Sequence, residues 1–326
     1  MNHAMVIHEY GGSEVLQWKE VTLADPAPGE VTIRHSAIGL NFIDVYHRTG
    51  LYPSDGLPFT PGLEAAGIVE AVGAGVVDLS PGDRVAYAGG PLGAYAESRN
   101  FPAQRLIKLP DGISERQAAA VMLKGMTAEY LVRRTYPVEA GETILVHAAA
   151  GGVGQLLCQW ALALGAEVIA TVGSEEKADL VRALGCQHVI NYRNEDVVKQ
   201  VEAITSGTGV PVVYDSVGKD TFESSLAVLA PRGTLVSFGQ ASGKVPPLDI
   251  TQLSAKGSLY LTRPTLFDYT RSREQLLQSS EALFGVILGG AVKLEIAQEY
   301  PLREAAQAHQ ALESRRTRGS TLLLPD

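Results

Sequence analysis

The stretch from Gly141 to Gly154 constrains this chain more than any other. The apolar residues 144–146 lead into a turn of small residues, and the turn opens onto an amphipathic segment, 155–164. Small residues let a backbone approach a pyrophosphate, whose charge is stabilised by free amides and by the positive end of a helix. This strand–turn–helix order therefore predicts a site for a dinucleotide.

The glycine pattern alone is weak support. The turn carries Gly151, Gly152 and Gly154, whereas the common fingerprint has a further glycine where Ala149 sits, and an ordinary turn would also explain it. The context favours the dinucleotide site, because a strand precedes the turn, a helix follows it, and a second strand ends about twenty residues later, as in the dinucleotide fold.

The end of that second strand discriminates between NAD and NADP. A carboxylate there would accept hydrogen bonds from the ribose 2′-hydroxyl of NAD. The sequence instead reads Val172, Gly173, Ser174, and the first acids lie beyond the turn, followed by Lys177. A hydroxyl and an ammonium favour a 2′-phosphate, so we expect NADPH. In the alternative reading, Lys177 belongs to a solvated helix face and pairs with a neighbouring glutamate.

Composition narrows the protein class. A chain of 326 residues is long enough for two domains, and its net charge of −9 gives no support to a nucleic-acid surface. The start of the chain does not resemble a secretion signal, and we find no window apolar enough for a membrane span. The only cysteines, Cys158 and Cys186, exclude a disulfide framework. We therefore expect a cytoplasmic protein without nucleic-acid or membrane partners.

The chain changes character near residue 115. Before it, short apolar runs (31–33, 65–72 and 84–87) alternate with Pro-Gly and Gly-Asp turns, which predicts a β-barrel-like domain. After a helix over 115–134, strands and helices alternate, which predicts a parallel sheet. Strands are expected at 143–148, 167–172, 189–191, 212–215, 234–238 and 258–262, and helices at 152–164, 175–184, 195–205 and 222–229. Two helices (273–288 and 303–313) and a strand (321–324) are expected to follow.

No metal centre or nucleophile is evident. A catalytic zinc could use His35, His47 and Glu64, but their spacing is not that of a ligand set. Cys158 lies in an apolar helical pattern and is read as core. The chain also lacks the Gly-x-Ser-x-Gly elbow of serine hydrolases. We therefore expect no metal ligands.

Further segments carry a resemblance to a known family. They are 39–53 (GLNFIDVYHRTGLYP), 61–73 (PGLEAAGIVEAVG), 82–86 (GDRVA), 123–130 (LKGMTAEY), 214–218 (YDSVG) and 232–239 (RGTLVSFG). Together with residues 141–154 they resemble the quinone oxidoreductase/ζ-crystallin group of the medium-chain dehydrogenase/reductase superfamily, especially its bacterial NADPH:quinone reductases. The zinc alcohol dehydrogenases of that superfamily carry ligands where Asn41 and Leu63 stand here, and neither residue is a plausible zinc ligand.

The resemblance implies an α/β protein with two domains. A GroES-like, β-barrel-type catalytic domain would comprise residues 1–125 and 265–326. A Rossmann domain, with a doubly wound parallel sheet that binds NADPH, would comprise residues 126–264. Similar proteins pair their sheets through an edge strand, here the segment from Leu259 to Thr262, so we expect a homodimer.

The resemblance also assigns roles by position. Gly152 and Val153 would meet the pyrophosphate. Tyr46 and Tyr52 would face the substrate, although they could equally be aromatics that pack a loop, and Asn41 is a further candidate contact. Ser216 follows a strand end, where either a ligand contact or a plain turn is expected. The remaining expected cofactor residues are Gly173, Ser174, Lys177 and Tyr192 at the 2′-phosphate, Thr127, Tyr130, Phe238 and Gly239 at the nicotinamide half, and Arg263.

The function expected from these features is hydride transfer from NADPH to a quinone without a metal. A quinone is electron-poor, so proximity and orientation meet most of the catalytic need. One alternative is a zinc-independent reductase of activated alkenes, such as enones or enoyl thioesters. Another is a crystallin-like or RNA-binding role, which other members of the family have.

Overall fold

The computed structural model describes residues 1–314 and 316–325, which divide into two compact units. Unit 1 comprises Met1–Met126, Thr270–Leu288 and the chain from Leu294 onward. Unit 2 comprises Thr127–Tyr269 and Gly289–Lys293. The sequence places the return to the first domain at residue 265, whereas unit 2 continues to Tyr269 and includes the short segment after helix α9 (Arg273–Leu288).

Unit 2 is built on a six-stranded sheet in which every neighbouring pair is parallel. The order is β10-β9-β8-β11-β12-β13, which is the strand order of a Rossmann fold. The order reverses between β8 and β11, and ligands of such sheets bind at that point, beyond the carboxyl ends of the strands. The strands are β8 (Thr143–Val146), β9 (Glu167–Val172), β10 (His188–Asn191), β11 (Val210–Asp215), β12 (Leu229–Ser237) and β13 (Tyr260–Thr262).

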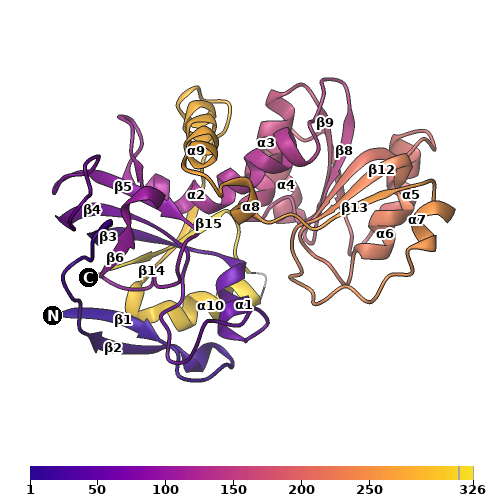
Figure 1. The fold of residues 1–326 in the computed structure, drawn as a ribbon. Helices are drawn as coiled ribbons and strands as arrows, with labels where there is room; N and C mark the ends of the chain where they lie inside the picture. Colours follow the sequence, from indigo (N-terminus) through magenta and orange to yellow (C-terminus); the bar gives the residue numbers. More distant parts are fainter. Residues whose placement is uncertain (315, 326) are drawn as a thin grey trace. The chain divides into compact units, whose positions relative to one another are not determined.

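Helices cover both faces of this sheet, as Figure 1 shows. The buried strand side chains, among them Leu145, Ile169 and Val213, form a core with the helices packed on them. This burial accounts for the nearly continuous apolar runs of the strands. The helices of unit 2 are α3 (Gly152–Ala163), α4 (Glu175–Ala183), α5 (Val197–Ile204), α6 (Phe222–Ala227), α7 (Thr251–Ala255) and α8 (Leu266–Tyr269).

Unit 1 contains a seven-stranded sheet around its own core. The central strand β3 pairs antiparallel with β4, β6 and β15, and a separate hairpin, β1-β2, precedes it. The strands are β1 (Asn2–Val6), β2 (Gln17–Val21), β3 (Glu30–Leu40), β4 (Glu64–Val72), β5 (Arg84–Ala88), β6 (Ser98–Pro102), β7 (Ile107–Lys108), β14 (Ile296–Pro301) and β15 (Ser320–Leu324).

The helices of unit 1 include one that the sequence did not predict. This helix, α1 (Phe42–Arg48), lies immediately after β3. The others are the long α9 (Arg273–Leu288), α10 (Ala305–Glu313) and α2 (Glu115–Tyr130) as far as Met126. No helix in the described part of the chain is long and apolar enough to cross a membrane.

The helix predicted over 115–134 is present, but its last turn has a different geometry. α2 (Glu115–Tyr130) gives way to a π-helical turn, Leu131–Thr135. In this wider turn the Tyr136 amide donates to the Leu131 carbonyl at 3.2 Å, and the hydroxyl of Tyr214, from β11, also donates to that carbonyl. The Leu131 carbonyl thus accepts two hydrogen bonds, which fits the wider turn. The spacing of apolar residues in the sequence does not reveal this turn.

Candidate cofactor and substrate sites

The turn after β8 has the geometry that a pyrophosphate requires. Ala148 adopts a left-handed φ of 52°, and its carbonyl accepts a hydrogen bond from the Gly151 amide at 2.9 Å. A Cβ at Gly154 would lie 2.4 Å from the Ala148 oxygen, so only glycine lets α3 approach the turn this closely. Ala149 is fully buried, so its methyl group packs inward, which explains why alanine is accepted in place of the fingerprint glycine.

The start of α3 leaves its first amides without a side-chain cap. The N-cap residue is Gly151, and no side chain accepts from this end of the helix. The first backbone N–H groups of a helix have no partner within it, so those of Gly152 and Val153 point outward with the positive end of the helix dipole. These residues fit the pyrophosphate of a dinucleotide, because both the donors and the glycine-lined approach are present.

The structure brings together the four residues predicted at the 2′-phosphate. β9 and β10 are neighbours, with Val172 opposite Asn191, so Gly173 and Tyr192 follow the same edge. A Cβ at Gly173 would lie 2.4 Å from the Tyr192 hydroxyl, so the tyrosine covers the glycine. Ser174 caps α4 by accepting from the Lys177 amide at 3.3 Å. The serine hydroxyl hydrogen is therefore available to donate to an anion.

Two further residues belong to this corner: Glu175, interpreted from the sequence as an acid beyond the turn, and Arg193, which was not singled out. Glu175 accepts a hydrogen bond from the Asn191 side chain at 2.6 Å, which ties that carboxylate to the end of β10. Arg193 is exposed and follows Tyr192 directly, and its backbone N–H donates to Asn191 Oδ1 at 3.3 Å, so it adds a cation to the segment after β10. Its position after a predicted strand was the available signal, because basic residues at such ends favour phosphate.

Beside the point where the strand order of this sheet reverses, the segments after β11 and β12 contact each other. The amides of Phe238 and Gly239 both lie within hydrogen-bond distance of the Asp215 carbonyl. A Cβ at Gly239 would lie 2.4 Å from the Ser216 oxygen. Arg263 donates from one nitrogen to the carbonyls of Ser237 and Gly239, at 2.9 and 2.8 Å. Arg263 thus fixes the loop after β12, whatever further contact it makes.

Thr127 and Tyr130 lie one helical turn apart on α2, both buried. The Tyr130 ring stacks on Tyr269, with centroids 4.3 Å apart and an interplanar angle of 10°. Burial raises the pKa of Tyr130 well above its usual value, and the nearby Arg263 partly opposes that shift. The hydroxyl of Tyr130 therefore stays protonated at neutral pH and can serve as a donor.

The three predicted substrate residues lie on or beside α1 in unit 1. The Tyr46 and Tyr52 rings pack edge to face, with centroids 5.1 Å apart, and Phe42 packs against Tyr46 at 5.5 Å. Asn41 is buried and donates through its side-chain amide to Glu64 at 2.7 Å and to the Gly39 carbonyl at 3.3 Å. Both tyrosines thus belong to an aromatic cluster, a type of surface that suits a flat ring.

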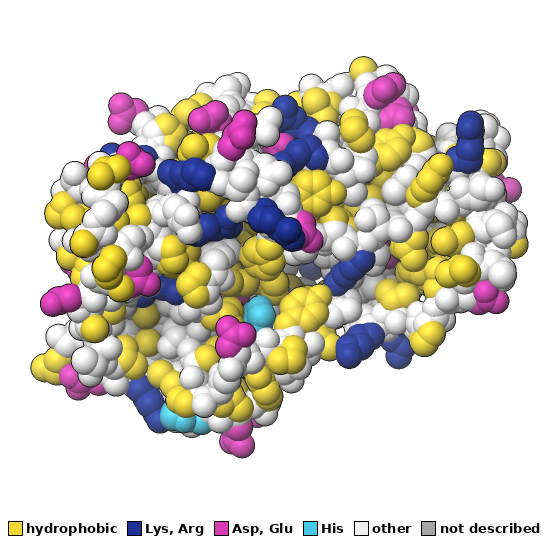
Figure 2. Space-filling model, viewed as in Figure 1, with side chains coloured by type: hydrophobic (Ala, Val, Ile, Leu, Met, Phe, Trp, Pro, Cys, Tyr) yellow, Lys and Arg dark blue, Asp and Glu magenta, His cyan; other side chains and the backbone are white. Residues whose placement is uncertain are grey.

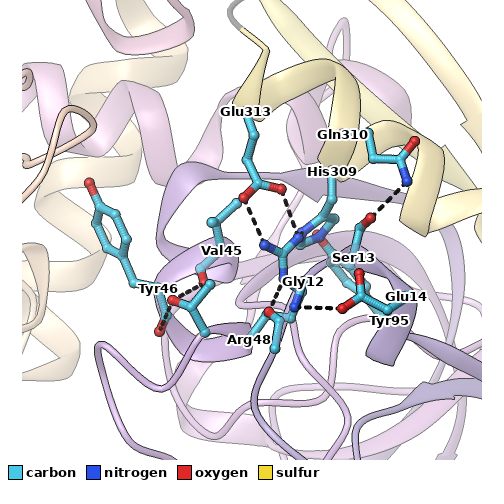
Figure 3. A network of polar contacts seen from close by, with 12 residues as sticks. Gly12, Ser13, Glu14, Val45, Tyr46, Arg48, Tyr95, His309, Gln310 and Glu313 are labelled. Atoms are coloured by element: carbon cyan, nitrogen blue, oxygen red, sulfur yellow. Dashed lines mark hydrogen bonds and ion pairs between the residues drawn. The ribbon is translucent and has the colours of Figure 1, made fainter.

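A buried polar network anchors the other side of α1. Arg48 is 1% exposed and makes a bidentate ion pair with Glu313 of α10. It also contacts His309, whose other ring nitrogen contacts the Tyr95 hydroxyl at 3.0 Å. Figure 3 shows this cluster, with the Tyr46 ring pointing away from it. The network therefore fixes the helix that carries Tyr46 without occupying its aromatic face.

The histidines that the sequence raised as zinc candidates are both engaged elsewhere. His35 lies within 2.7 Å of the Ala96 carbonyl and 3.0 Å of the Tyr87 hydroxyl. Burial lowers the pKa of His35 to about 3. His47 contacts the Tyr52 carbonyl at 3.0 Å. No group of three or more His, Cys, Asp or Glu side chains within residues 1–314 and 316–325 is placed to hold a metal ion.

Comparison with known families places this architecture. Residues 27–111 match the alcohol dehydrogenase GroES-like domain, and residues 152–279 match the zinc-binding dehydrogenase family. A quinone oxidoreductase of Pseudomonas aeruginosa is 56% identical over 97% of both chains. The chain belongs to the quinone oxidoreductases of this dehydrogenase family. The fold predicted from the sequence, a GroES-like domain with a Rossmann domain, is thereby confirmed.

Two further relatives of this family bear on the chemistry. The crystal structure of Escherichia coli quinone oxidoreductase complexed with NADPH is 51% identical, with a TM-score of 0.97, and the match covers 99% of this chain and 100% of that one. A 2-haloacrylate reductase of Burkholderia is 46% identical over 99% of this chain and 98% of its own length. The family therefore contains proteins named for quinones and a protein named for a halogenated alkene acid.

Proposed function

We propose that this chain is an NADPH-dependent quinone reductase. The observation that carries the proposal is the corner after β9, where Ser174 and Lys177 stand at the strand end and the first carboxylate in the sequence, Glu175, accepts a hydrogen bond from Asn191. This arrangement favours a 2′-phosphate over a 2′-hydroxyl. NADPH is also the molecule with which the related Escherichia coli enzyme was crystallised.

The residues of unit 2 would hold the cofactor. When bound, NADPH supplies the hydride. Gly152 and Val153 donate backbone N–H groups to the pyrophosphate, and Ser174, Lys177 and Tyr192, with Gly173 beneath the tyrosine, surround the 2′-phosphate. The nicotinamide half lies along the remaining predicted residues, Thr127, Tyr130, Ser216, Phe238 and Gly239, while Arg263 keeps the loop after β12 in place.

Unit 1 would hold the substrate. The aromatic cluster of Phe42, Tyr46 and Tyr52 offers ring faces and edges to a flat quinone. The tyrosine hydroxyls can donate hydrogen bonds to a quinone oxygen as it gains negative charge. Because a quinone accepts electrons readily, positioning and this charge stabilisation account for the chemistry.

A substrate panel tests this function. We expect the purified protein to oxidise NADPH with 1,4-benzoquinone at least tenfold more efficiently, in kcat/KM, than with a simple enone such as cyclohexenone. The measurement is the loss of NADPH absorbance at fixed enzyme concentration. A larger kcat/KM for the enone would overturn the quinone assignment and leave the cofactor assignment intact.

A second function is favoured by a specific relative. The 2-haloacrylate reductase shares 46% identity over nearly the whole chain, so reduction of an activated alkene is the runner-up. It would use the same residues of unit 2. Adding 2-chloroacrylate to the same panel distinguishes the two, since only an alkene reductase turns it over.

We also propose that the chain forms a homodimer through β13. This edge strand exposes Tyr260 by 61% and Leu261 by 38%, and exposed apolar edges tend to pair with another chain. Figure 2 shows exposed hydrophobic side chains over this part of unit 2. The two buried free cysteines agree with the cytoplasm as the compartment.

A further inference from the structure

A buried lysine in unit 1 has no role in the function proposed so far. The Lys124 side chain, on α2, is 7% exposed, and its ammonium lies 3.2 Å from Glu64, whose side chain is 0% exposed. Lysine and glutamate are rarely buried this deeply unless they are paired. Removing both charges from water costs free energy, and a buried ion pair therefore often contributes little to stability. This pair therefore calls for an explanation beyond stability.

The Glu64 carboxylate is held by donors from three directions. Its Oε2 accepts from Asn41 Nδ2 at 2.7 Å and from Lys124 Nζ at 3.2 Å, and its Oε1 accepts from the Leu123 amide at 2.6 Å. A Cβ at Gly39 would lie 2.2 Å from Oε2, so glycine leaves the space that the carboxylate fills. The local structure therefore fixes the negative charge and, through it, the lysine.

Asn41 and Lys124 differ in how many of their N–H groups already have an acceptor. Both amide hydrogens of Asn41 have acceptors, in Glu64 and the Gly39 carbonyl. Lys124 has three N–H groups; one donates to Glu64, and the described residues give the other two no acceptor. Beside the predicted substrate residue Asn41, Lys124 thus retains the donors for a further anionic or carbonyl oxygen.

The other charged group that faces Lys124 is Asp44. The ammonium works to lower the pKa of Asp44, and Glu64 works to raise it. Asp44 Oδ1 is buried without a partner among the described residues, whereas Oδ2 accepts from the Asn41 amide and the Tyr95 hydroxyl. The cluster therefore contains one fixed cation, one fixed carboxylate and one carboxyl with an unpaired oxygen.

We propose that Lys124 is a catalytic residue that donates a charge-assisted hydrogen bond to the substrate oxygen on which negative charge develops. The inference rests on the proposed function. A hydride carries two electrons and one proton to the quinone, so the immediate product is a hydroquinone monoanion. The Lys124 ammonium balances that charge until the oxygen takes a proton from solvent. Glu64 holds the ammonium in place, and in this scheme it is a positioning residue.

A phenol that the enzyme cannot reduce tests, without turnover, whether Lys124 stabilises negative charge on a bound oxygen. 4-Nitrophenol absorbs visible light only as its phenolate. We expect wild-type protein, at a pH below the ordinary pKa of this phenol, to bind it with a gain of phenolate absorbance. Lys124→Met should abolish the gain, Lys124→Arg should keep it, and Lys199→Met, an exposed control at 81% exposure, should leave it unchanged. No gain with wild type, or a full gain with Lys124→Met, overturns the proposal.

Kinetics separate this role from a structural one. Lys124→Met leaves the buried charge of Glu64 without its cation, so the double variant Lys124→Met/Glu64→Gln removes both charges together. We expect the double variant to melt near the wild-type temperature but to lose roughly a hundredfold in kcat with 1,4-benzoquinone, the loss typical of removing one oxyanion donor. Recovery of wild-type kcat in the double variant would overturn the proposal. Failure of wild type to reduce 1,4-benzoquinone would instead refute the proposed function, whatever the phenolate signal.

Discussion

The Tyr95 hydroxyl donates a hydrogen bond to Asp44 Oδ2 at 3.0 Å. This contact determines which atoms donate in the hydrogen bonds that continue from Tyr95 to His309 and Arg48. Because the tyrosine hydrogen is used on Asp44, its oxygen accepts from His309 Nε2. His309 must then carry its hydrogen on Nε2 and accept from Arg48 through Nδ1. Burial lowers the pKa of His309 to about 3, which agrees with this neutral tautomer.

The first prediction concerns the pH dependence of stability. Burial raises the pKa of Asp44 from 3.8 to about 7. Between these values the folded chain holds a proton on Asp44 and the unfolded chain does not, so the contribution of this residue falls as pH rises. Relative to Asp44→Asn, wild-type stability should fall by about 1.4 kcal/mol per pH unit from pH 4.5 to 6.5. Urea unfolding at several pH values measures this.

The comparison with Asp44→Asn also removes an opposing effect. The lowered pKa values of His35 and His309 raise stability as pH rises from about 3 to 6.5 in both proteins. Their contribution cancels in the difference between the two. A difference that stays constant across the range would mean that Asp44 is ionised in the folded chain throughout.

The second prediction concerns the ion pair that anchors α1. Glu313→Ala leaves the Arg48 guanidinium buried without its bidentate partner. We expect a loss of about 3 kcal/mol in the free energy of unfolding. Glu70→Ala is a matched control, because it breaks an ion pair with Arg34 in which both side chains are well exposed. That variant should cost less than about 1 kcal/mol, and equal losses would contradict the argument.

Local patterns in the sequence predicted unit 2 better than unit 1. In unit 2, strand β9 has the expected limits, and helices α3 and α4 begin at the expected residue and end one residue early, because apolar residues recur there at one period between clear turns. In unit 1, the apolar run 31–33 marked only part of β3, which extends from Glu30 to Leu40. Its polar residues Arg34 and His35 break the apolar run, but one is exposed and the other is buried through hydrogen bonds. Hairpin β1-β2 and helix α1 were missed because their elements are short, at five to seven residues each.

The candidate site also has a part that local sequence patterns predicted and a part that they did not. The phosphate-binding turn is contiguous in the sequence, so its glycines could be interpreted from their spacing. The pair of Glu64 and Lys124 joins residues that are 60 positions apart, and no spacing rule links them. The available signal was a charge within each of two otherwise apolar segments, at positions 62–66 and 121–126. The predicted roles of the site residues stay predictions.

The third prediction concerns the turn after β8. Gly154→Ala would place a methyl carbon 2.4 Å from the Ala148 oxygen and 2.8 Å from the Ala149 Cα, so either α3 or the turn must shift. We expect the dissociation constant for NADPH, measured by fluorescence, to rise at least tenfold. Gly285→Ala in α9 is the control, because nothing lies within 4 Å of its new Cβ, and it should be neutral or slightly stabilising. Wild-type affinity in Gly154→Ala would refute the proposed position of the pyrophosphate.

The fourth prediction separates NADPH from NADH. Lys177→Ala removes an ammonium whose charge-assisted bond to a 2′-phosphate is worth roughly 1.5–3 kcal/mol. The KM for NADPH should therefore rise by roughly ten- to a hundredfold, with little change in the KM for NADH. Lys199→Ala, in the exposed part of α5, controls for the loss of a surface charge. Equal effects on both cofactors would remove the basis for assigning NADPH.

The fifth prediction concerns assembly through β13. Leu261→Lys places a charge on the exposed edge strand, where charged residues oppose pairing between chains. Light scattering of the wild type at micromolar concentration should give twice the chain mass of 34.6 kDa, and the variant should shift toward the monomer. Val77→Lys is the control, because Val77 is 87% exposed and belongs to unit 1 rather than to β13. A monomeric wild type would reject the dimer, and a dimeric Leu261→Lys variant would place its interface elsewhere.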